Sequence, residues 1–324
     1  MGLVWRLLLL ALIPLRIFLE LFWCYIWTPR DKKTRTIHPA NKATNGRSPS
    51  TLPSSNGHDG QVDTTAVSPD KLKDLYDALD LWWGPTSCLQ VMSRMNKVRM
   101  PIIVQTYIRD VQGRQFDPSV PKEATPLLGA RICDVGCGGG YLTEALVDAG
   151  AEVVAIDANE VTLLAAKQHW TETRGLKVNG PEYHQALVQE FSQRHEGKFD
   201  IVVCSELIGN VTDSMSLIPH ILKLVREGGA VVITTNNRTL FSLLFTIIWL
   251  EHVAAVVPFN FRHLYKFIRP QELHRELKKY NVEPIETIGF LPLGLTARLT
   301  WRLQWVLTSF TGLWYAQVAK KVFA

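Results

Sequence analysis

The 324-residue sequence has few cysteines, and none of them form the arrangements that bind structural zinc or build a disulfide framework. The five thiols are odd in number, and no two follow the spacing C-x-x-C. A basic run with interleaved aromatic residues is also missing, which argues against nucleic acid as a partner. We therefore expect buried structural thiols in a reducing compartment; the cysteines are Cys24, Cys88, Cys133, Cys137 and Cys204.

The composition is that of a globular protein with a sizeable core. Hydrophobic residues make up 47% of the chain and charged residues 20%. This length suits one large domain with appendages, or two domains. The net charge of +5 is mild and permits contact with anionic lipid.

Residues 3–27 are almost wholly apolar and long enough to span a bilayer. Arg16 and Glu20 would be costly inside a membrane, but at a spacing of four residues on a helix they can pair. The basic flank at 30–35 favours the cytoplasmic or matrix side. Three interpretations stay open: a signal anchor, a cleaved signal peptide and a mitochondrial targeting segment.

The chain divides into three parts by composition. Residues 1–30 form the targeting or membrane-anchoring segment. Residues 31–68 are rich in small and polar residues, which predicts a disordered linker. Residues 69–324 are predicted to form the folded domain.

A glycine-rich loop follows a short apolar run in the stretch RICDVGCGGG at residues 131–140. Asp134 lies inside the run, and Gly136, Gly138 and Gly140 follow at alternate positions. Such a loop allows a sharp turn and close approach of a ligand to the backbone. A helix is predicted over 141–149. Strand, loop and helix together indicate a nucleotide-type site.

The spacing of these glycines differs from a dinucleotide fingerprint, which places its third glycine three residues after the second. The pattern D-x-G-x-G-x-G resembles the first motif of class I S-adenosylmethionine-dependent methyltransferases. A second strand, 152–156, ends at Asp157, and one carboxylate can accept hydrogen bonds from both hydroxyls of a ribose. The alternative is a tight turn with a helix-capping aspartate.

Further strands alternate with helices along the chain, which predicts an α/β fold with a doubly wound, mainly parallel sheet. Ligands of such sheets bind beyond the carboxyl ends of the strands. Asp134, Gly136, Asp157, Ser205 and Glu206 all fall at that edge. The further predicted strands are 182–184, 199–204, 230–235, 282–290 and 317–322.

Two other segments have open roles. Predicted helices over 70–83 and 91–110 either cover the cofactor site or only pack against the domain. The apolar stretch 240–257 is either a lid or membrane-dipping element, or a core helix. Basic residues follow it and suit phospholipid headgroups; they are Arg262, His263, Lys266 and Arg269.

Several motifs in a fixed order resemble the ubiquinone-biosynthesis O-methyltransferases (polyprenyl-dihydroxybenzoate methyltransferases), over roughly residues 79–290. They are Trp82-Trp83, Met95-Asn96-x-x-Arg99, the glycine loop 134–140, Asn237-Arg238-Thr239-x-x-Ser242 and Lys266-Phe267-Ile268-x-Pro270.

The resemblance implies a class I methyltransferase fold with a seven-stranded sheet and S-adenosylmethionine as cofactor. It implies cofactor binding by Arg99, the loop residues Asp134, Gly136 and Gly138, and by Asp157 and Ser205. It further implies a polyprenylated catechol as acceptor and a place on the matrix side of the mitochondrial inner membrane, in a quinone-biosynthesis complex. The segment 240–258 would then contact the membrane. Anchoring to another membrane by residues 3–27 is the alternative.

The sequence departs from the family at its metal ligands. The family usually has Glu-x-x-Glu-His after the fourth strand, and these side chains are proposed to hold a divalent cation. Here the three positions are Glu206, Gly209 and Asn210, so only Glu206 remains a strong ligand for Mg²⁺. Asn210 and Asp213 offer further oxygen atoms. Phe261-Arg262 replaces the Gly-Thr that usually precedes the family's histidine, here His263.

This departure bears on the chemistry, because a catechol hydroxyl with a pKa of about 9 to 10 is mostly protonated at neutral pH. A metal ion or a positioned base must assist its ionisation, and the candidate bases are Glu206 and His263. The leading hypothesis is methylation of a polyprenylated catechol in ubiquinone biosynthesis. The alternatives are a metal-independent methyltransferase of another lipophilic acceptor and a non-catalytic scaffold protein.

Overall fold

The structure is a computed structural model that describes residues 12–27, 69–84, 87, 89–117, 124–175, 180–211, 213–253, 261–293 and 304–323. The predicted linker at 31–68 lies outside these residues. All structural statements below concern the described part of the chain.

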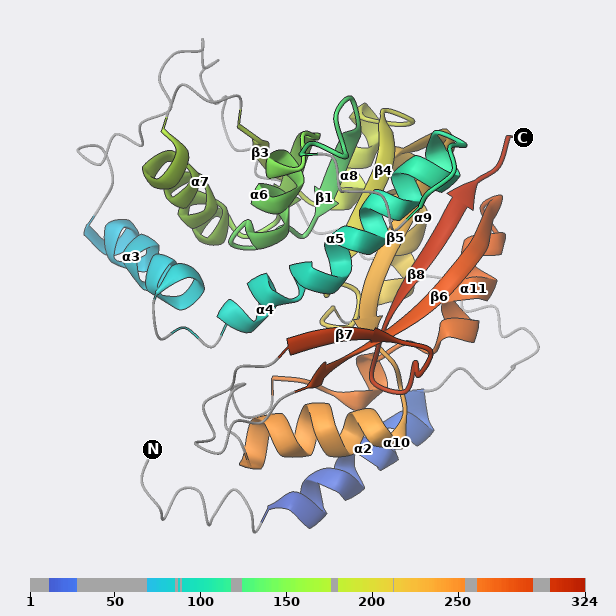
Figure 1. The fold of residues 1–324 in the computed structure, drawn as a ribbon. Helices are drawn as coiled ribbons and strands as arrows, with labels where there is room; N and C mark the ends of the chain where they lie inside the picture. The colour runs from blue at the N-terminus through green and yellow to red at the C-terminus, as the bar shows by residue number, and fades with distance from the viewer. Residues whose placement is uncertain are drawn as a thin grey trace, which may run out of the picture.

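One eight-stranded sheet runs through the domain in the order β3-β2-β1-β4-β5-β8-β6-β7 (Figure 1). The first five strands in that order are parallel, whereas β8 is antiparallel to both β5 and β6. The sheet is therefore doubly wound and mainly parallel, as the sequence predicts. Its strands are β1 Arg131–Val135, β2 Glu152–Asp157, β3 Glu182–Gln185, β4 Phe199–Ser205, β5 Val225–Asn236, β6 Val282–Leu293, β7 Gln304–Thr308 and β8 Trp314–Lys321.

Helices cover both faces of the sheet because side chains along each strand alternate between the faces. Cys133 and Val135 face a core shared with α8 (Val188–Arg194), α9 (Ser214–Leu224) and α11 (Pro270–Lys278). Ile132 faces the opposite core, which α5, η2 and α6 cover. The remaining helices are α2 Ile13–Trp27, α3 Pro69–Trp83, α4 Gln90–Arg94, α5 Asn96–Gln105, η2 Thr106–Val111, α6 Tyr141–Asp148, α7 Glu160–Arg174, α10 Leu240–Ser242, η3 Leu243–Val253 and η4 Leu264–Lys266.

All seven strands predicted from the sequence are present, and the eighth, β7, was missed. β7 pairs antiparallel with β6, and its Trp305 is buried against Phe290 and Trp314. The strand forms because the tryptophan covers the core while the backbone extends the sheet at its edge. The cysteine prediction also holds for Cys133, Cys137 and Cys204, which are buried, and burial raises the pKa of each thiol.

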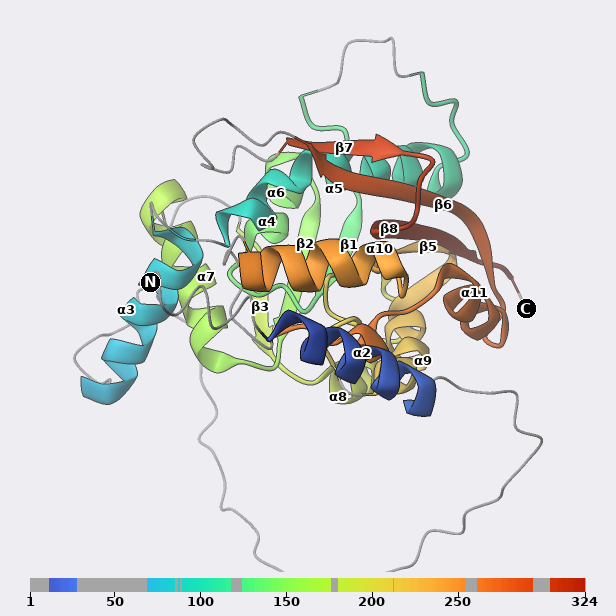
Figure 2. The same cartoon turned by 90° about the horizontal axis from the view of Figure 1, so that it is seen from below.

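The amino-terminal helix α2 packs against the domain, beside η3 and η4, in both views (Figures 1 and 2). Ile13 and Ile17, one turn apart, contact an apolar cluster that includes Ile247 and Phe267. Arg16 points the same way and is buried. Its guanidinium lies 4.0 Å from the carboxylate of Glu251 in η3. The pairing with Glu20 stays a prediction, because the side chain of Glu20 lies outside the described residues.

The apolar stretch predicted at 240–257 is helical from Leu240 to Val253. Residues 254–260 are outside the described part of the chain. Among the helices that the structure describes, none is both long and apolar enough to cross a membrane.

Candidate active site

The glycine loop is tied to the end of β2. The backbone N–H groups of Gly136 and Cys137 both donate to the carbonyl of Ile156, at 2.8 and 3.1 Å. Gly138 has a φ of +54°, and a Cβ atom there would lie 2.5 Å from the Trp82 ring. Glycine is therefore required both by the backbone conformation and by the close approach of this ring.

Asp157 lies at the same end of β2 and connects the loop to α7. Its carboxylate accepts hydrogen bonds from the backbone N–H groups of Gly138 and Asn159, each at 2.9 Å. The sequence places this acid at the carboxyl edge, and the structure puts it directly against the glycine loop.

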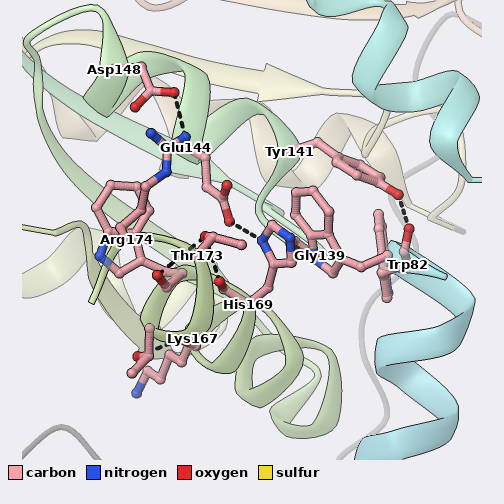
Figure 3. A network of polar contacts seen from close by, with 12 residues as sticks. Trp82, Gly139, Tyr141, Glu144, Asp148, Lys167, His169, Thr173 and Arg174 are labelled. Atoms are coloured by element: carbon pink, nitrogen blue, oxygen red, sulfur yellow. Dashed lines mark hydrogen bonds and ion pairs between the residues drawn. The ribbon is translucent and has the colours of Figure 1, made fainter. Parts of the chain in front are cut away.

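Hydrogen bonds of Trp82 and Trp83, the last two residues of helix α3, hold this helix over the glycine loop. The Trp83 indole N–H donates to the carbonyl of Gly139 at 2.9 Å, and the Tyr141 hydroxyl donates to the carbonyl of Trp82 (Figure 3). The Trp83 ring stacks on His169, with 3.4 Å between centroids, and His169 in turn contacts Glu144 at 2.7 Å. Of the two roles left open for 70–83, the structure favours covering the loop.

Asp134 is buried beneath the loop at 1% exposure. Its carboxylate accepts a hydrogen bond from the Thr143 hydroxyl at 2.7 Å. Burial raises the pKa of Asp134 to about 6, while the Thr143 hydrogen bond and the charge of Arg99 act in the opposite direction. The loop thus has a carboxylate beneath it that is ionised at neutral pH but close to titration.

Arg99 reaches from α5 to the end of β4. Its guanidinium donates to the Ser205 hydroxyl at 2.8 Å and to the Asn96 side-chain oxygen at 2.7 Å. Its Nε is buried and has no hydrogen-bond partner among the described residues. Burial lowers the pKa of Arg99 to about 10, against the charges of Glu206 and Asp134, so it remains a cation at neutral pH. A buried cation with an unused donor is suited to an anionic ligand.

Glu206 follows β4 with a φ of +57°, an uncommon backbone conformation for a residue other than glycine. Thr234 at the end of β5 donates to its carboxylate at 3.0 Å and also contacts Ser205 at 2.9 Å. The Trp314 side chain hydrogen-bonds to the same carboxylate, and burial raises the pKa of Glu206. Strained backbone of this kind is common at functional sites.

Arg262 is the cation that acts most strongly on Glu206, ahead of Arg99, and it lowers the pKa of that carboxyl. The Arg262 guanidinium centre lies 5.9 Å from the centroid of the Trp314 ring, and its Nη1 is buried without a hydrogen-bond partner among the described residues. Arg262 therefore faces inward, whereas the sequence suggested a headgroup-facing residue. The His263 ring lies 5.3 Å from that of Tyr265.

The remaining family metal positions do not face the Glu206 carboxylate. The Asn210 side chain donates instead to the Glu206 backbone carbonyl, at 2.6 Å. Gly209 packs close to Thr235, so that a Cβ there would lie 2.8 Å from the threonine hydroxyl. Asp213 caps α9 by accepting from the Ser216 N–H. No group of three His, Cys, Asp or Glu residues suited to a metal occurs in the described ranges, so these residues do not fit the family's cation.

Two contributors were missed from sequence alone. Thr234 and Trp314 come from β5 and β8 and converge on Glu206. The position of Thr234 at the end of a predicted strand was the available signal, because strand ends at the carboxyl edge line the ligand site. Nothing local marks Trp314, whose place depends on the antiparallel pairing of Trp314 with Asn236.

Comparison with known proteins identifies the class and then the family. A sequence model described as "Methyltransferase domain" matches residues 107–287. With the sheet order and the glycine loop, this makes the protein a class I S-adenosylmethionine-dependent methyltransferase.

Curated relatives narrow the class. The chain is 34% identical over 223 residues to "Ubiquinone biosynthesis O-methyltransferase" of Aromatoleum aromaticum, covering 69% of this chain and 86% of that protein. It is 36% identical over 217 residues to the protein of the same name from Dechloromonas aromatica, covering 67% and 84%. The chain belongs to the family of ubiquinone biosynthesis O-methyltransferases, which confirms the resemblance stated from its motifs.

Proposed function

We propose that the protein methylates a hydroxyl of a polyprenylated catechol in ubiquinone biosynthesis, with S-adenosylmethionine as the methyl donor. The observation that carries this proposal is the gathering of the glycine loop, Asp157, Arg99 and Glu206 at one edge of the sheet. The relatives are named for this pathway, which supports the same assignment.

The cofactor fits the residues present. When bound, it supplies a methyl group on a positively charged sulfur atom. Asp157 would accept from the ribose hydroxyls, and Arg99, with its unused Nε, would bind the carboxylate of the methionine part. Gly136 and Gly138 give the loop its left-handed turn, Ser205 orients Arg99 at 2.8 Å, and Asp134 places negative charge beneath the loop.

Glu206 is the proposed base for the acceptor hydroxyl. Burial raises the pKa of Glu206, which brings it closer to the pKa of the hydroxyl that Glu206 must deprotonate. Hydrogen bonds from Thr234 and Trp314 hold the carboxylate in position. His263 follows Arg262 directly and is the second candidate base. The residues do not fit a divalent cation, so we assign no step to Mg²⁺.

We also propose that the protein binds a lipid surface through α2 and the α10–η3 helix, on the matrix side of the mitochondrial inner membrane. The two helices lie side by side (Figure 2), and both expose large apolar side chains. Phe18 is 61% exposed and Phe241 is 62% exposed, and Leu15, Leu240 and Leu244 are exposed beside them. Exposed apolar groups gathered on neighbouring helices suit peripheral binding to a membrane that also holds a prenylated substrate.

Vesicle binding tests the lipid surface. We expect Phe18→Ser with Phe241→Ser to reduce co-sedimentation with anionic phospholipid vesicles, whereas Leu128→Ser, at a 71% exposed position elsewhere, leaves it unchanged. Equal binding by both variants would contradict this surface.

Labelled methyl transfer tests the reaction. The full chain is incubated with labelled S-adenosylmethionine and a panel of catechols that carry prenyl chains, with a chelator or with Mg²⁺. We expect transfer to a prenylated catechol under both conditions. Cofactor binding without transfer to any catechol would overturn the proposed reaction.

A further inference from the structure

The family's metal positions are altered in this protein, but the same part of the site contains a fixed positive charge. Gly209 and Asn210 provide no ligand aimed at the Glu206 carboxylate, whereas Arg262 is the largest positive influence on it. The site therefore has a cation of its own beside the candidate base.

The backbone of Arg262 is held by two hydrogen bonds, and its guanidinium lies over an aromatic ring. Its backbone N–H donates to the Glu251 carboxylate at 2.8 Å, and its carbonyl accepts a hydrogen bond from Arg16 of α2. The Trp314 ring lies under the guanidinium and also hydrogen-bonds to Glu206. The fixed backbone and the ring beneath the guanidinium limit the positions that this side chain can take before a ligand binds.

One donor of this guanidinium is unused. Nη1 is buried and has no hydrogen-bond partner among the described residues. A buried charged donor is costly to leave unpaired, so its retention at the substrate edge points to a ligand that supplies an anionic oxygen.

We propose that Arg262 binds the reacting oxygen of the acceptor as an oxyanion and thereby takes the role that a divalent cation has elsewhere in the family. This inference rests on the proposed function, because the oxygen is that of the catechol hydroxyl. The hydroxyl proton passes to the Glu206 carboxylate, and the phenolate remains beside the guanidinium. The oxygen then forms a bond to the methyl carbon, while the carbon–sulfur bond breaks and leaves its electron pair on sulfur as a neutral thioether.

The first experiment follows binding alone, with 4-nitrocatechol, a coloured catechol whose absorbance distinguishes phenolate from phenol. Metal-free full-length protein with a chelator is titrated with this probe between pH 5 and 9. We expect the bound probe to ionise at lower pH than the free probe, Arg262→Gln to abolish that shift, and Arg262→Lys to retain part of it. Arg269→Gln, at an exposed position in the same segment, is the control and should behave as the unmodified protein.

A shift that persists in Arg262→Gln, or that appears only after Mg²⁺ is added, would overturn the assignment. Cofactor affinity and melting temperature are measured on each variant. If Arg262→Gln loses cofactor binding and melts early, Arg262→Lys decides the matter: a folded Lys variant without any shift also overturns the proposal.

The second experiment measures methyl transfer against pH. Loss of one oxyanion donor lowers kcat by about 100-fold, so Arg262→Gln should lose that much at pH 7. It should recover towards pH 10 as the catechol ionises without help, with the KM for the cofactor unchanged. A pH-independent loss would show a purely structural role and refute the proposal. If the unmodified protein transfers no methyl group, the proposed function fails, while the nitrocatechol titration still decides the role of Arg262.

Discussion

The sheet edge formed by β1 and β2 and the edge formed by β4 and β5 are built in different ways. At the first, backbone N–H groups of the glycine loop donate to the Ile156 carbonyl and to the Asp157 carboxylate, all within about 25 residues of sequence. At the second, Glu206 is surrounded by side chains from β5, β8 and the segment after η3. The first edge, the proposed cofactor half, depends mainly on local backbone geometry, to which Arg99 and Ser205 add one long-range contact, and it follows the family pattern. The second edge, the proposed acceptor half, depends on long-range contacts and departs from that pattern.

A substitution of Asp157 is the most direct test of the proposed cofactor half, because it should impair cofactor binding. We expect Asp157→Ala to weaken S-adenosylmethionine binding by about 100-fold, because charged hydrogen bonds to two hydroxyls and the tie to the loop are lost together. Isothermal titration calorimetry measures the change. Glu152→Ala, at the exposed opposite end of the same strand, is the matched control. If the affinity for S-adenosylmethionine falls by less than about threefold, Asp157 does not bind the ribose hydroxyls.

Glu251 provides the corresponding test of the acceptor half. It is buried, accepts from the Arg262 N–H and faces Arg16. Glu251→Gln should reduce the free energy of unfolding by about 2–3 kcal/mol, because it leaves the Arg16 charge poorly compensated. The melting temperature should fall by about 5–10 °C, with cofactor affinity unchanged.

Glu286→Gln is the control for this variant, because Glu286 pairs with Arg109 at the surface at 3.2 Å. Surface pairs contribute little, so its effect should stay within about 1 kcal/mol. If both variants melt alike, α2 is not coupled to the acceptor half through Glu251.

These two regions also differ in how well the sequence predicts them. The sequence predicts that the glycine loop and Asp157 lie at the same edge, and the structure places them together, because the signal lies within one strand–loop–helix–strand unit. The direction of the Arg262 side chain could not be predicted. A basic residue after an apolar segment gives the same sequence pattern whether it faces lipid headgroups or Glu206. Arg16 shows the same limit, because nothing local predicts its contact with Glu251, which is far away in the sequence. Side chains that meet across the fold leave no local pattern.

Restoring the family's metal ligands sharpens the comparison. In Gly209→Glu with Asn210→His, the new Cβ at position 209 meets the Thr235 hydroxyl, and we expect a loss of about 1–2 kcal/mol of stability. Mg²⁺ binding, measured by calorimetry, should stay weak because Arg262 keeps its positive charge beside Glu206. Adding Arg262→Ala should strengthen Mg²⁺ binding. Tight Mg²⁺ binding by the double variant would show that Arg262 does not oppose the ion.

The smallest expected effect concerns Asp134, and it belongs to the cofactor half. Its pKa in the folded protein is about 6, above the ordinary value of 3.8, so the folded state binds a proton more tightly than the unfolded chain does. This group therefore makes the cofactor-free protein more stable as pH falls from 7 towards 4. The positive charge of S-adenosylmethionine favours the ionised carboxylate, so binding below pH 6 must expel the proton.

Cofactor affinity should accordingly be constant from pH 7 to about pH 6.5 and fall several-fold by pH 5. Calorimetry in buffers of different ionisation enthalpy measures the proton released. Asp134→Asn keeps the size of the side chain and an acceptor for Thr143, so it should bind less tightly at pH 7 but lose this pH dependence. If the cofactor affinity of the Asn variant depends on pH as strongly as that of the unmodified protein, the proton belongs to another group. The pH dependence of cofactor binding would then not come from Asp134.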